Sequence, residues 1–368
     1  YLSEIDGAET RGRISAAAAR QRRGLFTGSL AMADIADCDL IIEAVFEDMG
    51  LKREVFAQMD RFSARHAILA SNTSSLDLDE IAAATSRPAD VVGLHFFSPA
   101  HVMSLLEIVR GRATSPDILA TALTLARHIG KQPVISGVCD GFIANRIFDQ
   151  YFREADFLVE EGASPYDVDD ALTGFGMPMG PFAVSDLVGL DVGQFIRKRQ
   201  RAALKPGLRY STLEDEIVAT GRLGRKTGRG WYTYQEGQRT GACDPEVLSI
   251  IDRHRLTLGR KARPVSGPEI IERCLFALIN EGGKLLDEGI AARASDIDVA
   301  AVHGYGFPRY RGGPMKFADT LGLATVAAVV ERHFREQGEW WRPSPLLLDL
   351  ARTGQSLAAR RVESVVLP

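Results

Sequence analysis

One histidine and one carboxylate stand where a general base could be built. His95 lies near the end of a short apolar run, and Glu107 lies inside the next apolar run, twelve residues later. A carboxylate in a buried strand is costly unless it is paired. Glu107 could form an ordinary ion pair with Arg110 or Arg146, or it could hold and polarise His95 so that the imidazole accepts a proton. The residues alone leave both interpretations open.

Polar side chains also follow two earlier apolar runs. Glu43 and Glu47 lie at the end of residues 40–45, and a Ser/Asn/Thr cluster, residues 71–75, follows residues 67–70. Such clusters are also typical of turns and helix N-caps, so each signal is weak by itself. An α/β sheet binds its ligand at the carboxyl ends of its strands. Because several polar clusters fall at such ends, together they predict a site there.

The element pattern before residue 138 indicates a covered sheet. Continuous short apolar runs are typical of strands buried on both faces of a mostly parallel sheet. Helical patterns at residues 52–64 and 116–130 alternate with them, which predicts an α/β fold. Residues 1–24 predict one polar helix followed by a loop. The predicted strands are residues 40–45, 67–70, 91–97, 105–109 and 133–136.

Helical spacing dominates after residue 138, and it contains an internal repeat. Gly174-Phe175-Gly176-Met177-Pro178 matches Gly304-Tyr305-Gly306-Phe307-Pro308, and four further landmarks recur in the same order. Two copies of one helical domain are therefore predicted, about 130 residues apart. The expected domains are residues 1–137, 138–236 and 247–368, with a Gly- and Pro-containing linker before the last.

Composition excludes several classes of function. The chain has 368 residues and a net charge of -4 with both signs interspersed, so no nucleic-acid or membrane-surface partner is indicated. No apolar stretch approaches the roughly 18 residues that cross a bilayer, and the N-terminus has no apolar signal core. The cysteines show no metal-binding spacing, so no metal is expected. We expect them to be reduced thiols in a cytoplasmic protein. They are Cys38, Cys139, Cys243 and Cys274.

A set of motifs across the chain resembles the 3-hydroxyacyl-CoA dehydrogenase family. These motifs are Ser71-Asn72-Thr73-Ser74-Ser75, His95-Phe96-Phe97-Ser98-Pro99, Glu107, Gly141-Phe142-Ile143-Ala144-Asn145-Arg146 and Gly224-Arg225-Lys226-Thr227-Gly228-Arg229-Gly230-Trp231-Tyr232. The duplicated second half, with Gly304 to Pro314, resembles the bacterial and peroxisomal multifunctional β-oxidation enzymes. The resemblance covers essentially the whole chain.

The resemblance implies roles for four catalytic residues. His95 would take the proton of the substrate's 3-hydroxyl group, and Glu107 would orient His95 and stabilise its charged form. Ser74 and Asn145 would hydrogen-bond the reacting oxygen. The family's usual His-Phe-Phe-Asn-Pro has Ser98 in place of its Asn, and Ser98 receives no role.

The resemblance also implies an NAD cofactor. Alcohol oxidation needs a hydride acceptor, and no side chain is one. Glu47 and Lys52 match positions that touch the cofactor, and Asn72 matches one beside the nicotinamide. No GxGxxG turn, which normally holds the pyrophosphate, occurs in the sequence. The family's first strands and glycine loop are therefore expected upstream of Tyr1, and further upstream the hydratase/isomerase half of multifunctional relatives.

The sequence thus predicts an incomplete Rossmann-type doubly wound sheet followed by two duplicated helical 3-hydroxyacyl-CoA dehydrogenase C-terminal domains. The predicted function is NAD-dependent oxidation of (S)-3-hydroxyacyl-CoA in fatty-acid β-oxidation, in the bacterial cytoplasm, with a thiolase or a second copy as the expected partner. The alternatives are a 6-phosphogluconate or nucleotide-sugar type of dehydrogenase and an inactive, crystallin-like relative. The second helical copy is expected to be structural. The basic run 197–201 is expected to be a solvated helix face, with contact to CoA phosphates as the alternative.

Overall fold

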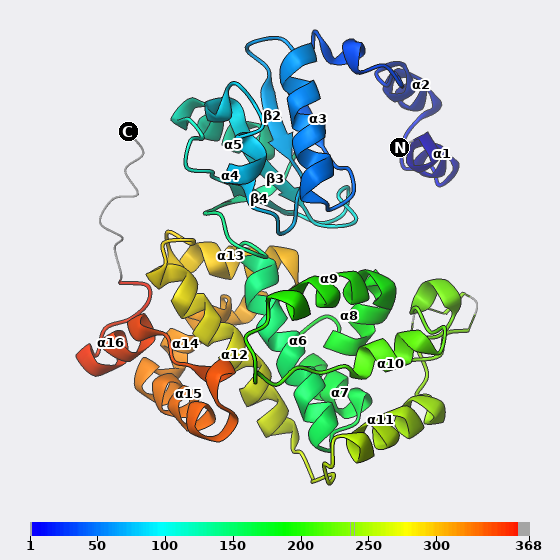
Figure 1. The fold of residues 1–368 in the computed structure, drawn as a ribbon. Helices are drawn as coiled ribbons and strands as arrows, with labels where there is room; N and C mark the ends of the chain where they lie inside the picture. Colours follow the sequence, from blue (N-terminus) through cyan, green and yellow to red (C-terminus); the bar gives the residue numbers. More distant parts are fainter. Residues whose placement is uncertain (1, 236, 239, 360–368) are drawn as a thin grey trace.

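A five-stranded sheet forms one end of the computed structural model, which describes residues 2–235, 237–238 and 240–359 (Figure 1). All five predicted strands are present, in the spatial order of the sequence. Neighbouring strands run parallel except β3 and β4, which are antiparallel. The strands are β1 (Leu40–Glu43), β2 (Ile68–Ser71), β3 (Val91–Phe96), β4 (Leu105–Val109) and β5 (Gln132–Ser136).

Helices cover both faces of this sheet, as the apolar runs predict. On one face Phe56 and Met59 of α3 (Met49–Phe62), with α4 (Leu78–Ala82), pack on the strands. On the other face α5 (Pro116–His128) packs through Leu119 and Ala122. Successive strand residues alternate between the two clusters, because side chains along a strand point to opposite faces.

The strand β1 is an edge of the sheet. Within the described residues it pairs only with β2, and Ile42 is 41% exposed. The carboxyl end of β1 nevertheless lies beside those of β2 and β3, where the site is predicted.

Residues 2–24 contain two helices, so the prediction of one helix and a loop is wrong. These are α1 (Leu2–Thr10) and α2 (Ala16–Gly24), which lie away from the sheet (Figure 1). Gly12, at φ +65°, ends the first helical stretch. Ser15 caps the second by accepting a hydrogen bond from the Ala18 N–H at 3.2 Å. A capping serine between two polar helical segments was the overlooked signal.

The predicted repeat appears as two series of helices in the same order. The first series is α6 (Ala144–Glu161), α7 (Pro165–Phe175), α8 (Pro181–Val188), α9 (Leu190–Ala203) and α10 (Leu213–Ala219). The second series is α12 (Gly267–Asp287), α13 (Ala294–Gly304), α14 (Pro314–Leu321), α15 (Leu323–Gln337) and α16 (Pro345–Thr353).

Two repeated aspartates explain why the landmarks recur. Asp169 accepts hydrogen bonds from the backbone of Phe182 and Ala183 at the start of α8. Asp298 does the same for Met315 at the start of α14. Asp186 and Asp319 likewise each bind two backbone N–H groups at the end of their own series. The carboxylates satisfy N–H groups that helix and loop ends leave unpaired.

The two series pack along α6 and α12 through a buried ion network. Arg273 of α12 contacts Glu154 at 2.8 Å and Glu161 at 2.6 Å, both on α6. Arg273 and Glu154 are 1% and 0% exposed. Because each charge has a partner, burial does not leave an unpaired ion.

The helix α11 (Pro245–Thr257) stands between the two series and packs on the first. His254 contacts Glu160 of α6 at 3.3 Å and Glu216 of α10 at 2.7 Å. The predicted domain boundary at residue 247 falls inside this helix, and residues 360–368 of the predicted second copy lie outside the described residues.

Candidate active site

A cavity of about 840 Å³ lies between the carboxyl ends of the strands and the helical region. Its walls include the predicted residues Glu47, Asn72, Ser74, His95 and Asn145. The fold therefore brings five of the seven predicted site residues to one space. Glu107 and Lys52 are the other two, and both lie behind this wall.

His95 and Glu107 are paired, as the base interpretation requires. Their positions face each other across the antiparallel β3 and β4, and His95 Nδ1 lies 2.7 Å from Glu107 Oε2. The other carboxylate oxygen, Oε1, accepts hydrogen bonds from the N–H groups of Ile143 at 3.1 Å and Ala144 at 2.9 Å. These N–H groups begin α6, where the helix dipole also stabilises an anion. Glu107 is fully buried, so this dual anchoring fixes the imidazole rigidly.

The alternative pairing of Glu107 with Arg146 does not occur. Arg146 instead contacts Glu281 at 2.8 Å and Glu288 at 2.6 Å, both on α12. The side chain of Arg146 joins the two helical series, and the carboxylate of Glu107 remains with the histidine.

Asn145, the second residue of α6, is held through its carbonyl oxygen. Tyr305 donates a hydrogen bond to Asn145 Oδ1 at 2.7 Å. Among the described residues, the amide nitrogen Nδ2 has no hydrogen-bond partner. Because Asn145 and His95 line the same cavity, this N–H group is available to a ligand there.

Glu47 organises the loop after β2. Its Oε1 accepts hydrogen bonds from Thr73 Oγ1 at 2.6 Å, from the Ser74 N–H at 2.9 Å and from Ser75 Oγ at 3.0 Å. Burial raises the pKa of Glu47, but these hydrogen bonds and the Lys52 charge outweigh it and lower the pKa below its usual value. Glu47 is therefore ionised, and its carboxylate holds the loop of residues 73–75 in place through hydrogen bonds.

Asn72 and Ser74 differ in their freedom to meet a ligand. Asn72 Oδ1 accepts a hydrogen bond from the Phe96 N–H at 2.8 Å, which ties the ends of β2 and β3 together. Ser74 Oγ lies 3.3 Å from Glu47 Oε1, at the long end for such a bond. The Ser74 hydroxyl can therefore turn to donate to a ligand oxygen, whereas the amide oxygen of Asn72 already accepts a hydrogen bond from the backbone.

Lys52 does not line the cavity. It is 1% exposed, with its Nζ 2.7 Å from Glu43 Oε1 and 3.3 Å from Glu47 Oε2. Glu43 also accepts a hydrogen bond from Ser71 Oγ at 2.7 Å. Lys52 and Glu43 thus hold β1, β2 and Glu47 in place from behind.

The expectation that the basic run on α9 is a solvated face is wrong for three of its five residues. Arg197, Arg199 and Gln200 line the cavity, whereas Lys198 and Arg201 are exposed. Arg199 donates to Ser75 Oγ and contacts Asp140 at 2.8 Å. Arg197 contacts Asp215 at 2.8 Å and also pairs with Glu214. The sequence shows the cations but not their distant carboxylate partners, which is why the run looked solvated.

The second helical series also contributes to the cavity, against the expectation that it is only structural. Tyr305 and His303, at the end of α13, both line it. His303 Nδ1 lies 2.9 Å from Ser104 Oγ, beside the start of β4. The available signal was the repeated motif itself, in which Tyr305 replaces the Phe175 of the first copy.

The residues fit the nicotinamide end of NAD but not its phosphates. Glu47, Asn72, Ser74 and His95 surround the ends of β1, β2 and β3, where a nicotinamide would meet a base. A pyrophosphate needs a glycine-rich turn between a strand and a helix N-terminus. No turn of this kind follows a strand in residues 2–235.

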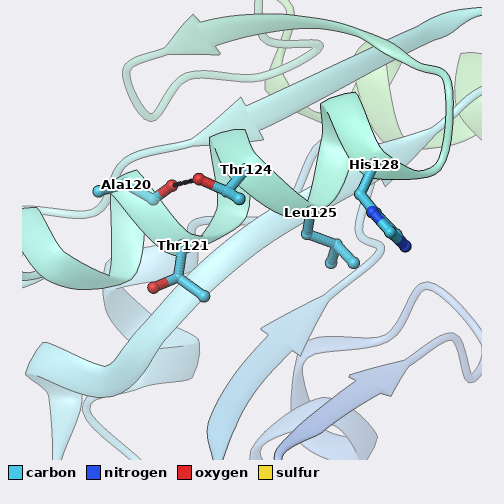
Figure 2. A pocket seen from close by; sticks show the side chains of 5 residues that line it. All are labelled: Ala120, Thr121, Thr124, Leu125 and His128. Carbon is cyan, nitrogen blue, oxygen red and sulfur yellow. Dashed lines mark hydrogen bonds between the residues drawn. The ribbon is translucent and has the colours of Figure 1, made fainter.

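The part of the chain that the structure describes has neither a metal-binding cluster nor a membrane-spanning helix. No group of three or more His, Cys, Asp or Glu residues could hold a metal ion, and no helix is long and apolar enough to cross a membrane. A second hollow, of about 440 Å³, lies on the outer face of α5. Figure 2 shows the side chains that line it, which are Ala120, Thr121, Thr124, Leu125 and His128. Its one drawn hydrogen bond, Thr124 Oγ1 to the Ala120 carbonyl oxygen, lies within the helix.

Known proteins resemble the chain over nearly its whole length. The guinea pig (Cavia porcellus) peroxisomal bifunctional enzyme is 46% identical over 84% of this chain and 44% of its own length. The Brassica napus glyoxysomal fatty acid beta-oxidation multifunctional protein MFP-a is 39% identical over 95% of this chain and 49% of its own. The chain spans about half the length of these curated relatives.

Solved structures share the fold. 3-Hydroxybutyryl-CoA dehydrogenase from Escherichia coli K12 has a TM-score of 0.81 at 26% identity, covering 96% of this chain and 89% of that chain. The dehydrogenase part of multifunctional enzyme 1 from C. elegans has a TM-score of 0.66 at 31% identity, covering 94% and 79%.

The relatives contradict the expected bacterial cytoplasmic location, since the curated ones are peroxisomal or glyoxysomal and come from eukaryotes. That expectation rested on scattered thiols and on the lack of an apolar signal core, features that do not distinguish one compartment from another.

The family models agree with the fold described above. The 3-hydroxyacyl-CoA dehydrogenase NAD-binding domain matches residues 2–139, and the C-terminal domain of the same family matches twice, at residues 141–234 and 270–361. A base-forming His/Glu pair at the strand ends, a duplicated helical domain and these matches together show that the chain belongs to the 3-hydroxyacyl-CoA dehydrogenase family.

Proposed function

We propose that this chain supplies the base and the substrate-binding groups for NAD-dependent oxidation of (S)-3-hydroxyacyl-CoA to 3-oxoacyl-CoA, as the dehydrogenase part of a multifunctional fatty-acid β-oxidation enzyme. The pairing of His95 with Glu107 at the cavity wall carries the proposal. It is a positioned base beside a space lined by hydrogen-bonding groups, which alcohol oxidation requires.

In the proposed mechanism His95 accepts the hydroxyl proton. Glu107 occupies Nδ1, so Nε2 is the nitrogen left for the substrate. As the proton arrives, the Glu107 carboxylate stabilises the imidazolium, and the α6 N–H groups keep that carboxylate in place. NAD, when bound, supplies the hydride acceptor.

Asn145 and Ser74 would hold the reacting oxygen. The free N–H group of Asn145 and the loosely held Ser74 hydroxyl can both donate to an oxygen next to His95. Such preorganised donors stabilise charge that develops in the transition state. Glu47 and Asn72 would shape the nicotinamide end, and Lys52 would act on the cofactor only through Glu47.

The residues of this site do not support the alternative of a 6-phosphogluconate or nucleotide-sugar type of dehydrogenase. Those classes use a Lys or Cys in catalysis. Lys52 is buried between two carboxylates. Burial raises the pKa of the Cys139 thiol to about 11, which keeps it protonated and unreactive.

Two substitutions test the proposal in the full-length protein, which here means a protein that contains this chain together with a glycine-rich turn for the NAD pyrophosphate. His95→Gln should lower kcat by about a hundredfold to ten-thousandfold, the usual contribution of a positioned base, with little change in KM. Glu107→Gln should be similarly severe, because the imidazolium loses its counter-charge. Glu288→Gln, which removes a carboxylate away from the cavity, is the control. Near-normal kcat in either the His95 or the Glu107 variant would contradict the proposal.

The domain boundaries 138–236 and 247–368 and the thiolase partner or self-association remain predictions. Limited proteolysis tests the boundaries, because cleavage concentrates in exposed linkers. Light scattering of the purified protein, alone and mixed with a thiolase, tests the assembly.

A further inference from the structure

The second helical series places one aromatic ring inside the active-site wall. The helix α13 packs against β4 and β5, and the chain turns into the cavity directly after it. There the Tyr305 ring stacks on Phe148 of α6, with ring centroids 3.9 Å apart and planes 13° apart. The ring also meets Phe97 edge-on at 6.0 Å. Neighbours from both domains therefore fix the position of this ring.

The glycines on either side of Tyr305 make this close approach possible. A Cβ at Gly304 would lie 2.8 Å from Leu105 Cδ2. Gly306 has φ +74°, and a Cβ there would lie 2.6 Å from Pro178 Cγ. Glycine on both sides of Tyr305 thus lets the ring enter this space, because larger residues at those two positions would clash with their surroundings.

The hydroxyl of Tyr305 determines which way the Asn145 amide points. It donates to Asn145 Oδ1 at 2.7 Å, and burial holds the pKa of Tyr305 far above its usual value, so the hydroxyl stays a donor. An amide has an acceptor at one end and two donors at the other. With the acceptor end bound to Tyr305, the donor end must face the other way.

The first copy offers an internal comparison. Phe175 occupies the matching place in the repeat and packs on Phe307 and Phe317 of the second series. It has a similar ring but no hydroxyl, and it does not line the cavity. The hydroxyl therefore occurs in the copy whose ring reaches the cavity.

We infer that Tyr305 is a positioning residue: it holds the Asn145 amide with its N–H group toward the reacting oxygen of the substrate. The inference rests on the proposed function and extends the active site to the second helical copy. Without the hydroxyl the amide can turn over, and it would then present a lone pair to the oxygen that becomes a carbonyl.

The test is Tyr305→Phe in the full-length protein. The ring and its stacking remain, so folding should be unaffected. The kcat value should fall by about threefold to tenfold with KM nearly unchanged, as for one lost hydrogen bond felt in the transition state. The control is Tyr310→Phe, which removes a hydroxyl bonded to the Phe175 carbonyl oxygen at 2.9 Å, outside the cavity. It should leave kcat unchanged.

A double-mutant cycle separates positioning from a structural role. Asn145→Ala should lower kcat by about a hundredfold to a thousandfold, the usual effect of losing such a donor. In that background Tyr305→Phe should have no further effect, because there is no amide left to orient. An equal loss in both backgrounds, or an unchanged kcat in the single variant, would overturn the inference.

The outcome is distinguishable from failure of the proposed function. If His95→Gln is inactive while Tyr305→Phe equals the wild type, only the positioning inference fails. If His95→Gln keeps its activity, the proposed function fails first.

Discussion

At the scale of single residues, Asp149 stands apart because the fold raises the pKa of its carboxyl group far above the usual value. It lies one turn after Asn145 on α6 and lines the cavity. Gln200 Nε2 donates to its Oδ2 at 3.0 Å. Burial, followed by the nearby charge of Asp140, raises the pKa of Asp149 from 3.8 to about 7. Its charge therefore changes near neutral pH.

This pKa shift predicts a pH-dependent stability. Between pH 4 and pH 7 the unfolded chain loses the Asp149 proton while the folded chain keeps it. Stability therefore falls as the pH rises through this window, by at most about 1.4 kcal/mol per pH unit, and levels off above it. Asp149→Asn removes the effect, so its stability relative to the wild type should rise from pH 4 to 7.

Thermal unfolding at several pH values measures this difference. Asp349→Asn, which changes an exposed aspartate on α16, is the control. A stability difference between Asp149→Asn and wild type that does not vary with pH would show that Asp149 is ionised in the folded protein.

The sequence was sufficient to predict those site residues whose positions follow from the order of the strands. His95 and Glu107 fall on adjacent strands, and a carboxylate in an apolar run already calls for a partner. Tyr305 and Asp149 went unrecognised because their roles depend on a contact 160 residues away and on burial in a cavity wall, respectively. Neither leaves a trace in local spacing.

At the scale of elements, the β3–β4 pair has almost no free space near His95, the proposed base. Gly93 faces Val109 across the two strands, and a Cβ at Gly93 would lie 2.6 Å from Val109 Cβ. Both atoms are attached directly to the backbone, so neither can turn away. The strands would have to separate, and His95 lies two residues further along β3.

Gly93→Ala should therefore destabilise the protein by about 1–3 kcal/mol, as overpacking does. Gly174→Ala is the matched control. Gly174 lies in α7 with nothing within 4 Å of an added Cβ, so alanine should stabilise the helix by about 0.5–1 kcal/mol. Urea denaturation compares the two variants. Equal stability of Gly93→Ala and wild type would mean that the strand pair can separate freely.

The elements themselves were predictable where burial is continuous. Strands covered on both faces are runs of apolar residues, and five such runs gave five strands. The helix α9 was misjudged because Arg197 and Arg199 meet carboxylates and a serine from other elements. A cation in an ion pair and a cation in water look alike in a sequence.

At the scale of the whole molecule, the described residues provide the nicotinamide end of a cofactor site but not its phosphate end. The nicotinamide end of the site is built from β1, β2 and β3, but β1 is an edge within the described residues, without a glycine-rich phosphate turn beside it. We therefore predict that the 368-residue chain, expressed as it stands, binds NAD weakly or not at all.

Isothermal titration tests this prediction, with 3-hydroxybutyryl-CoA as the comparison ligand. The proposed acyl-CoA site consists of His95, Asn145 and the helical region, so it should retain more of its affinity. Micromolar NAD binding would contradict the prediction and place the phosphate contacts on other residues.

The packing of α12 along α6 has a consequence for mass action. If the two helical copies were separate chains, the Tyr305 wall would come from another molecule, and dilution below the dissociation constant would dismantle the site. On one chain the encounter is intramolecular, so its effective concentration does not fall on dilution. Specific activity should then be independent of enzyme concentration. The covalent link also frees the two copies to differ: one has Phe175 where the other has Tyr305.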